Sequence, residues 1–424
     1  MKYLLLTLFF GSFLITDGQD IDKLARQIEP KMIEWRHHFH QNPELSNREF
    51  NTAKKIEEHL RGLGLEVQTG VAYTGVVGIL KGGKPGPVIG IRADIDGLPV
   101  TERVDIPYKS EAIGEYNGEK SGVMHACGHD THISVAMAVA EILAGMKKDL
   151  NGTVKFVFQP AEEGPPKEEG GGAPMMVKEG VLKNPDVDVM FGMHIKSNMH
   201  VGSIGYKTGG IMAAADRLYI TVNGKQSHGS RPWAGIDPIT VSSQIIMGLQ
   251  TIVSRQMELT KEAAVISIGQ IEGGVRFNII PESVSLVGTI RTLDPEMQKS
   301  IHQKIERTTR LIAESAGATA DVEIFIENPV TYNDPELTTM MAPSLKKSCE
   351  DLQLVKASTG AEDFSFFALE VPSIYFWVGG CPKDIPLEEA PDHHTPDFYV
   401  DDSGMVTGVK AFLNLTLDYM KMNK

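Results

Sequence analysis

Five short β-rich runs, several of them apolar throughout, restrict the fold of this chain more than any other feature. They span residues 75–80, 88–95, 153–158, 187–194 and 373–378. Strands that are buried on both faces, as in parallel sheets, have continuous apolar sequences. Half-exposed strands alternate between apolar and polar residues. Helical patterns such as residues 133–146 lie between some of these runs. The sequence therefore predicts an α/β domain, with a mixed, mostly parallel sheet and helices on both faces.

A different pattern occupies the middle of the chain. Strand-like and helical runs follow one another there in the order β-α-β-β-α-β, over residues 216–222, 237–255, 264–271, 283–292, a helix starting near 294, and 322–326. This order is the split-βαβ, ferredoxin-like unit. We expect an inserted α+β domain over residues 210–326, between the two parts of a main domain at 20–209 and 327–424.

The N-terminus reads as a targeting segment. Met1 and Lys2 precede an apolar run over residues 3–15, which is short for a membrane span. We predict a signal peptide over residues 1–19 and a secreted or periplasmic protein with no membrane contact after cleavage. An uncleaved anchor is the alternative.

The charge and cysteine content narrow the possible partners. The chain has 41 basic and 55 acidic residues, a formal net charge of −14, and no basic run. This argues against nucleic acid and anionic membranes as partners. Three cysteines are too few for a disulfide framework. Whether Cys349 and Cys381 pair stays open.

Four sets of metal-type ligands follow strands or begin a helix. They are Asp94 and Asp96, in the segment directly after residues 88–91; Cys127 and His129 before the helix at 133; Glu162 and Glu163 after run 153–158; and His194 with His394. In open α/β sheets, ligands bind beyond the carboxyl ends of the strands. Taken singly, each set could be a solvated turn or a satisfied polar group. Together they provide a thiolate, three imidazoles and one or two carboxylates, enough for two metal ions sharing a bridge.

These motifs resemble the metal-dependent amidohydrolase branch of the aminoacylase and carboxypeptidase superfamily, which includes hippurate hydrolases, N-acyl-amino-acid amidohydrolases and auxin-conjugate hydrolases. The resemblance covers nearly all of the chain after the signal. It rests above all on Arg92-Ala-Asp-Ile-Asp-Gly-Leu-Pro99, Met124-His-Ala-Cys-Gly-His-Asp-Thr-His132, Gln159-Pro-Ala-Glu-Glu-Gly164, Gly224-Lys-Gln-Ser-His-Gly229, Gly360-Ala-Glu-Asp-Phe364 and His394-Thr-Pro396.

The resemblance implies a role for each matching residue. It makes Cys127 the bridging ligand and Glu162 the general base; the remaining ligands are His129, Glu163, His194 and His394. By the same resemblance, Asp96 would orient a metal ligand and His228 would stabilise the oxyanion. Asn278 and Gly360 would position the substrate.

The same resemblance implies the cofactors and partners. Two divalent ions per subunit (zinc, manganese, cobalt or nickel) would serve the hydrolysis of N-acyl-amino acids or short peptides. The inserted domain would act as a lid and as the contact of a homodimer. Two alternatives stay open: a thiol hydrolase that uses Cys127, and a non-catalytic metal-binding or ligand-binding protein of the same fold. An enlarged loop at residues 165–173 leaves the shape of the substrate pocket open.

Overall fold

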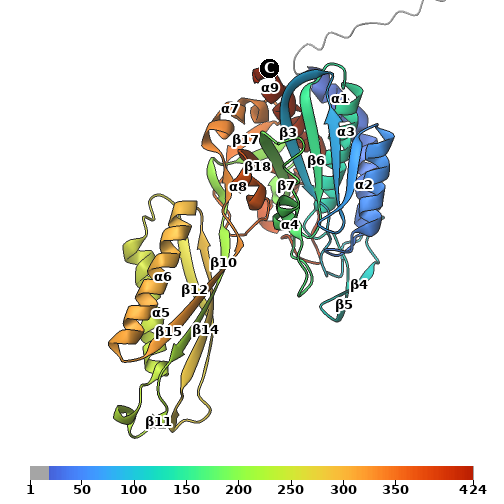
Figure 1. Ribbon diagram of the computed structural model, residues 1–424. Helices are drawn as coiled ribbons and strands as arrows, with labels where there is room; N and C mark the ends of the chain where they lie inside the picture. The colour runs from blue at the N-terminus through green and yellow to red at the C-terminus, as the bar shows by residue number, and fades with distance from the viewer. Residues whose placement is uncertain (1–18, 424) are drawn as a thin grey trace, which may run out of the picture.

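The computed structural model describes residues 19–423 and consists of two lobes (Figure 1). The larger lobe contains both termini of the described chain, and the smaller lobe extends from it as a narrow body. The predicted signal peptide, 1–19, lies outside the described residues except for Gln19. Within residues 19–423, no helix is both long enough and apolar enough to cross a bilayer.

An eight-stranded sheet forms the centre of the larger lobe. In spatial order its strands are Glu66–Val71 (β1), Gly75–Lys81 (β2), Asn151–Gln159 (β6), Lys84–Asp94 (β3), Val189–His200 (β7), Ser373–Cys381 (β18), Ser203–Tyr206 (β8) and Asp351–Leu354 (β17). The four central strands β6, β3, β7 and β18 are parallel, while β1, β2 and β8 add antiparallel pairings. The predicted mixed, mostly parallel sheet is confirmed.

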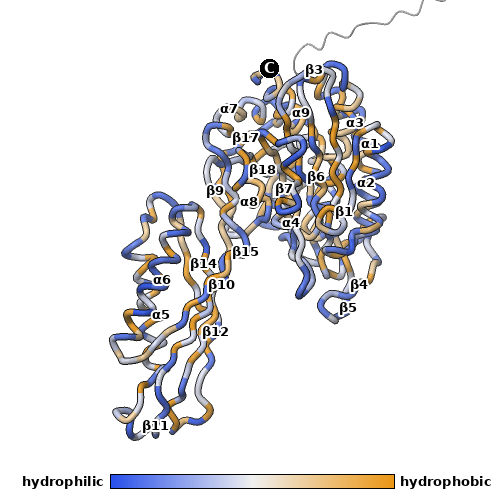
Figure 2. Tube along the Cα trace, in the orientation of Figure 1, coloured by the Kyte–Doolittle hydropathy of each residue, from blue (hydrophilic) through white to orange (hydrophobic). Residues whose placement is uncertain are grey.

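Helices cover both faces of this sheet, as predicted. One face packs against Gln19–Gln41 (α1), Phe50–Gly62 (α2), His129–Gly145 (α3), Pro335–Lys346 (α7) and Gly404–Met422 (α9). The other face packs against Gly172–Lys178 (α4) and Ser365–Glu370 (α8). Figure 2 shows the apolar residues concentrated along the central strands between these two layers. Because both faces are covered, the middle of a central strand is apolar, as over residues 189–193 of β7 and 374–378 of β18.

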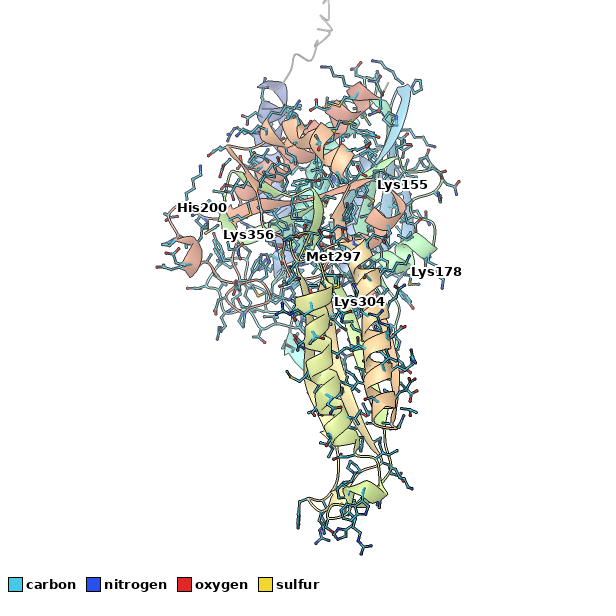
Figure 3. All side chains as sticks on the ribbon, turned by 90° about the vertical axis from the view of Figure 1, so that its left-hand side faces the viewer. Lys155, Lys178, His200, Met297, Lys304 and Lys356 are labelled. Atoms are coloured by element: carbon cyan, nitrogen blue, oxygen red, sulfur yellow. The ribbon has the colours of Figure 1, made fainter. Side chains whose placement is uncertain are left out.

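The smaller lobe has the split-βαβ order. Its antiparallel sheet runs Ala264–Gly273 (β12), Ser283–Thr292 (β14), Ala214–Asn223 (β10) and Thr319–Asn328 (β15). Two helices, Pro238–Gln256 (α5) and Pro295–Ser315 (α6), lie side by side on one face (Figure 3). Each helix begins with an aspartate cap, because Asp237 and Asp294 accept hydrogen bonds from backbone N–H groups of the first turn. A proline follows each cap, at a position where its missing N–H costs no helical hydrogen bond.

Short ribbons complete the structure. Strands Gly209–Met212 (β9) and Thr331–Asn333 (β16) pair where the chain passes between the lobes. Ser227–His228 (β11) pairs with Ile279–Ile280 (β13) at the far end of the smaller lobe. Ile113–Tyr116 (β4) and Glu119–Gly122 (β5) form a hairpin.

Candidate active site

The predicted ligands meet at the carboxyl ends of the central parallel strands. Asp96 follows β3, Glu162 and Glu163 follow β6, and His194 lies on β7. Cys127 and His129 stand at the start of α3, and His394 comes from the loop before α9. Segments that are far apart in sequence therefore converge at one edge of the sheet.

Two backbone features set the turns that carry these ligands. Gly128, between Cys127 and His129, has φ +92°, and a Cβ there would lie 2.4 Å from Cγ2 of Ile195. Only glycine adopts this conformation without strain. Ala161, just before Glu162, has φ +53°, and its N–H donates to the buried Glu49 carboxylate at 2.9 Å.

The Cys127 thiol lies among the predicted ligands. Its Sγ is 3.3 Å from Nε2 of His194 and 3.2 Å from Nε2 of His394. The same His394 nitrogen is 3.1 Å from Oε1 of Glu163, which is 3.8 Å from Nε2 of His129. Ligands of one tetrahedral ion are separated by about 3.3 to 3.7 Å, as follows from metal–ligand distances near 2.0 to 2.3 Å.

The histidine rings present the nitrogen that a metal requires. His129 donates from Nδ1 to the backbone oxygen of Asp96 at 2.9 Å, with Oδ1 of Asp96 at 3.2 Å. His194 donates from Nδ1 to the Ile195 carbonyl at 2.5 Å. In both rings Nε2 is therefore the nitrogen that faces the Cys127 and Glu163 side.

His132, which the sequence analysis left outside the ligand set, uses both ring nitrogens elsewhere. Its Nδ1 lies 2.5 Å from Oδ1 of Asp94, and its Nε2 accepts from the Ile195 N–H at 2.9 Å. Asp94 is also paired with the buried Arg92, at 2.7 Å. Asp94 and His132 therefore support the ligand shell from behind.

The residues fit two metal ions that share Cys127. Among the groups whose ligand atoms lie within 4.8 Å of one another, two contain Cys127: Cys127 with His129 and His194, and Cys127 with Glu163 and His394. Nε2 of His129 is buried and makes no hydrogen bond with any residue in 19–423. Oε1 of Glu163 is also buried without a hydrogen bond that meets the geometric criteria, and its near neighbours are the other proposed ligands, His394 and His129. A metal ion that both atoms face would satisfy them.

The electrostatics of the donor set also call for a cation. Burial, together with Glu163 and Glu162, raises the pKa of the Cys127 thiol well above its ordinary value. A divalent cation removes this penalty because it binds the thiolate directly.

Glu162 stands beside the ligands without being fixed by them. Its Oε2 is 4.0 Å from Nε2 of His129, and its carboxylate groups with Glu362 and Asp363. Burial, then repulsion from Glu362 and Glu163, raises the pKa of Glu162 well above its ordinary value. A carboxylate of this kind takes up a proton readily, as a general base must.

A cleft of about 310 Å³ opens over the site. Its lining contains the predicted residues Cys127, Glu162, Glu163, His194, His394 and Gly360. It also contains Lys196, Ser358, Glu362 and His393, which the sequence analysis did not assign. His393 points Nδ1 at Cys127 Sγ, 3.8 Å away, while its Nε2 accepts from the Ser197 N–H at 3.2 Å.

The sequence held a signal for Lys196 that was not used. The predicted strand ended at His194, but β7 continues to His200. Alternate residues of a strand share a face, so the longer strand places Lys196 on the same face as the predicted ligand His194.

Two of the predicted residues are not at this cleft. His228 is exposed on β11, and Asn278 lies beside it, since the Gly229 N–H donates to the Asn278 carbonyl at 2.9 Å. Both belong to the far end of the smaller lobe, which Figure 1 shows well away from the larger sheet. Within one chain, the structure therefore does not bring them to Glu162.

The chain is similar to known proteins over nearly its whole length. The model of peptidase family M20/M25/M40 matches residues 90–418. Thermostable carboxypeptidase 2 of Saccharolobus solfataricus is 38% identical, over 93% of this chain and 97% of that protein. N-acetyl-L-cysteine deacetylase of Bacillus subtilis is 34% identical, over 92% and 90% of the two chains. Hippurate hydrolase of Campylobacter jejuni is 35% identical, over 91% and 96%.

Solved structures agree in fold. A proposed aminohydrolase from methicillin-resistant Staphylococcus aureus is 35% identical with a TM-score of 0.86, covering 95% of this chain and all of that one (100%). The YXEP protein of Bacillus subtilis, described as a dinuclear metal-binding peptidase of the M20 family, is 32% identical with a TM-score of 0.78, over 93% and 99% of the chains.

Proposed function

The chain belongs to peptidase family M20/M25/M40 and is a hydrolase of amide bonds, and we propose that it cleaves N-acyl-amino acids or short peptides with two metal ions. The observation that carries the proposal is the position of Cys127 Sγ, 3.3 Å and 3.2 Å from the Nε2 atoms of two histidines. A carboxylate that is not needed as a ligand, Glu162, lies beside this cluster.

The chemistry follows from the residues at the cluster. When bound, two divalent ions act as Lewis acids that make water more acidic and polarise the amide carbonyl. Glu162 takes the proton of the attacking water and then returns it to the leaving amine nitrogen. Asp96 holds His129 in the tautomer that keeps Nε2 free. The products are a carboxylic acid and an amine.

The substrate class is proposed from the relatives. The names of three of them refer to carboxypeptidase, N-acetyl-L-cysteine deacetylase and hippurate hydrolase. Hydrolysis by each of these three kinds of enzyme releases an amino acid from an amide bond. We therefore expect this chain to release an amino acid, with zinc, manganese, cobalt or nickel as the metal.

The two alternatives have less support. A thiol hydrolase needs a reactive thiolate, whereas burial and two carboxylates raise the pKa of Cys127. It also leaves Glu163 and His394 without a role. A non-catalytic binding protein would not require Glu162 beside the ligands.

A panel of amides tests the function. Hippurate, N-acetyl-L-methionine and an unblocked dipeptide are incubated with metal-loaded and with chelated protein, and free amino acid is measured. We expect release only with metal, restored when metal is added back to the chelated sample. Activity that survives chelation but is lost on alkylation would instead support the Cys127 thiol hydrolase.

We also propose that the protein works as a homodimer, in which His228 of a second subunit stabilises the oxyanion. The exposed position of His228 supports this, because its Nδ1 accepts from the Ser230 N–H at 3.1 Å and its Nε2 is left available to another chain. Two inactive variants, His228→Ala and Glu162→Gln, should regain activity when unfolded together and refolded as a mixture. No recovery in a mixture that contains dimers would contradict the shared site.

Export remains a proposal that rests on the predicted signal peptide. Expression of the full chain in a host with a secretory pathway, followed by N-terminal sequencing of the mature protein, tests it. Retention of Met1 in a protein that stays inside the cell would contradict it.

A further inference from the structure

A positive charge without a partner lines the active-site cleft. The Lys196 ammonium makes no hydrogen bond or ion pair with any residue of the described chain, 19–423. The ammonium lies over the ring of Trp377, whose centroid is 5.0 Å from Nζ. A lysine ammonium has three donors, and leaving them unpaired away from bulk water costs free energy.

The strand geometry directs Lys196 into the site. It lies on β7 two residues after the ligand His194, so both side chains leave the same face of the strand. The partner strand β18 places Trp377 opposite His194. The Trp377 ring therefore lies under the Lys196 ammonium, and Lys196 lines the cleft.

A second donor lines the same cleft. The Ser358 hydroxyl accepts a hydrogen bond from the Gly360 N–H at 3.1 Å, and its own proton has no acceptor among residues 19–423. Ser358 and Lys196 therefore both offer donors to a molecule in the cleft. An ammonium and a hydroxyl that line one cleft can both donate to an anionic group bound there.

The surrounding carboxylates do not pair with the Lys196 ammonium. Lys196 is within electrostatic reach of Cys127, Glu162 and Glu362 but is hydrogen-bonded to none of them. Glu362 is engaged by Arg92, at 2.8 Å, and by Tyr375, at 2.5 Å. Cys127 belongs to the proposed metal ligands, whose negative charge the ions would balance. The ammonium is then left for a group that the substrate brings.

We infer that Lys196 is the residue that binds the α-carboxylate of the substrate's amino acid, with Ser358 as a second donor. The inference rests on the proposed function, because it needs a substrate with a free carboxylate close to the scissile bond. In an N-acyl-amino acid, the carboxyl carbon is two bonds from the scissile nitrogen. A side chain two residues from a metal ligand is placed to reach such a group, whereas a distal acyl substituent lies further away.

Matched substrates and variants test the inference. N-acetyl-L-methionine is compared with N-acetyl-L-methioninamide, which has the same shape but no carboxylate charge. The variants are Lys196→Met, Lys196→Arg and the control Lys356→Met. Lys356 is exposed and two residues from Ser358, and Figure 3 labels it. Metal content and thermal unfolding show whether each variant is folded and loaded.

Binding is measured separately from turnover. In a Glu162→Gln background, calorimetry gives the affinity for N-acetyl-L-methionine with and without Lys196→Met. We expect Lys196→Met to weaken this binding and to lower kcat/KM for the carboxylate substrate by about 10- to 100-fold, mainly through KM. The carboxamide should change by less than about 3-fold, Lys196→Arg should keep most of the preference, and Lys356→Met should leave it unchanged.

The outcomes separate the two proposals. If the wild type hydrolyses both substrates equally, or if a folded, metal-loaded Lys196→Met keeps the preference, the inference is wrong while the amidohydrolase function stands. If the metal-loaded wild type releases no amino acid from any amide in the panel, the proposed function is wrong and the inference falls with it.

Discussion

Replacing His40 with glutamine should lower the free energy of unfolding by an amount that depends on pH. His40 is buried on α1, with Nδ1 3.0 Å from Oδ2 of Asp130 and Nε2 3.2 Å from Oε1 of Glu102. Burial alone would lower the pKa of His40, but these two carboxylates outweigh it and raise the pKa to about 9. The His40→Gln variant loses the cation and keeps a side chain that can form hydrogen bonds.

The pH dependence of this loss follows from the linkage between proton binding and folding. The unfolded chain has a histidine pKa of about 6.5, so the folded state binds the proton more tightly by about 2.5 pKa units. The stabilisation is complete below the unfolded pKa and is lost as the pH rises through about 9. It amounts to roughly 3 kcal/mol at pH 6, roughly 1.5 kcal/mol at pH 8 and less than about 0.5 kcal/mol at pH 9.5.

Urea unfolding at these three pH values measures the difference between wild type and variant. Both proteins carry the same metal load, so metal binding cancels in the difference. His38→Gln is the control, because burial lowers the pKa of His38 and its titration therefore lies below pH 6.5. A His40→Gln difference that stays constant or grows between pH 6 and pH 9.5 would refute the reasoning.

Three further variants probe the site and its support. Glu162→Gln should lower kcat by about 10²- to 10⁴-fold while elemental analysis still finds the wild-type metal content, and a small loss would remove Glu162 as the base. Cys127→Ser should lower the number of metal ions retained per subunit after dialysis, because a hydroxyl is a poorer ligand than a thiolate, and unchanged retention would contradict the shared bridge. Arg92→Met leaves three buried carboxylates without their cation, and should cost about 3 to 5 kcal/mol in chemical unfolding; a loss below about 1 kcal/mol would show that they protonate instead.

The sequence predicted the fold where a single physical cause acts on a whole segment. The central strands are buried on both faces, so they appear as apolar runs, and β6 and β18 lie where the pattern placed them. Helices α7 and α9 were not predicted. Thirteen residues of α9 are buried, from more than one side of the helix, so it lacks the one-sided stripe that identifies a surface helix.

The candidate site was predictable where ligands follow strands, and less so where position depends on tertiary structure. Cys127, Glu163 and His394 converge as the strand-end argument requires. Lys196 was overlooked because its strand is longer than the apolar run. The role of His228 in the site of a second subunit stays a prediction, because the sequence pattern does not state at which end of the smaller lobe a residue lies. Cys349 and Cys381, whose pairing was left open, are both free.

The sheet order also has a consequence for how the chain acquires its structure during synthesis. Strand β7 pairs with β18, yet the whole sheet of the smaller lobe, β10 to β15, is encoded between them. The smaller lobe consists of contiguous sequence and can fold as soon as it leaves the ribosome, whereas the central sheet must wait for a partner that is made much later. His394 is made later still, so a nascent chain cannot hold its full complement of ligands. The complete metal site therefore forms only in the finished polypeptide, and we expect refolding to show an early phase for the smaller lobe and a late, metal-sensitive phase for the larger one.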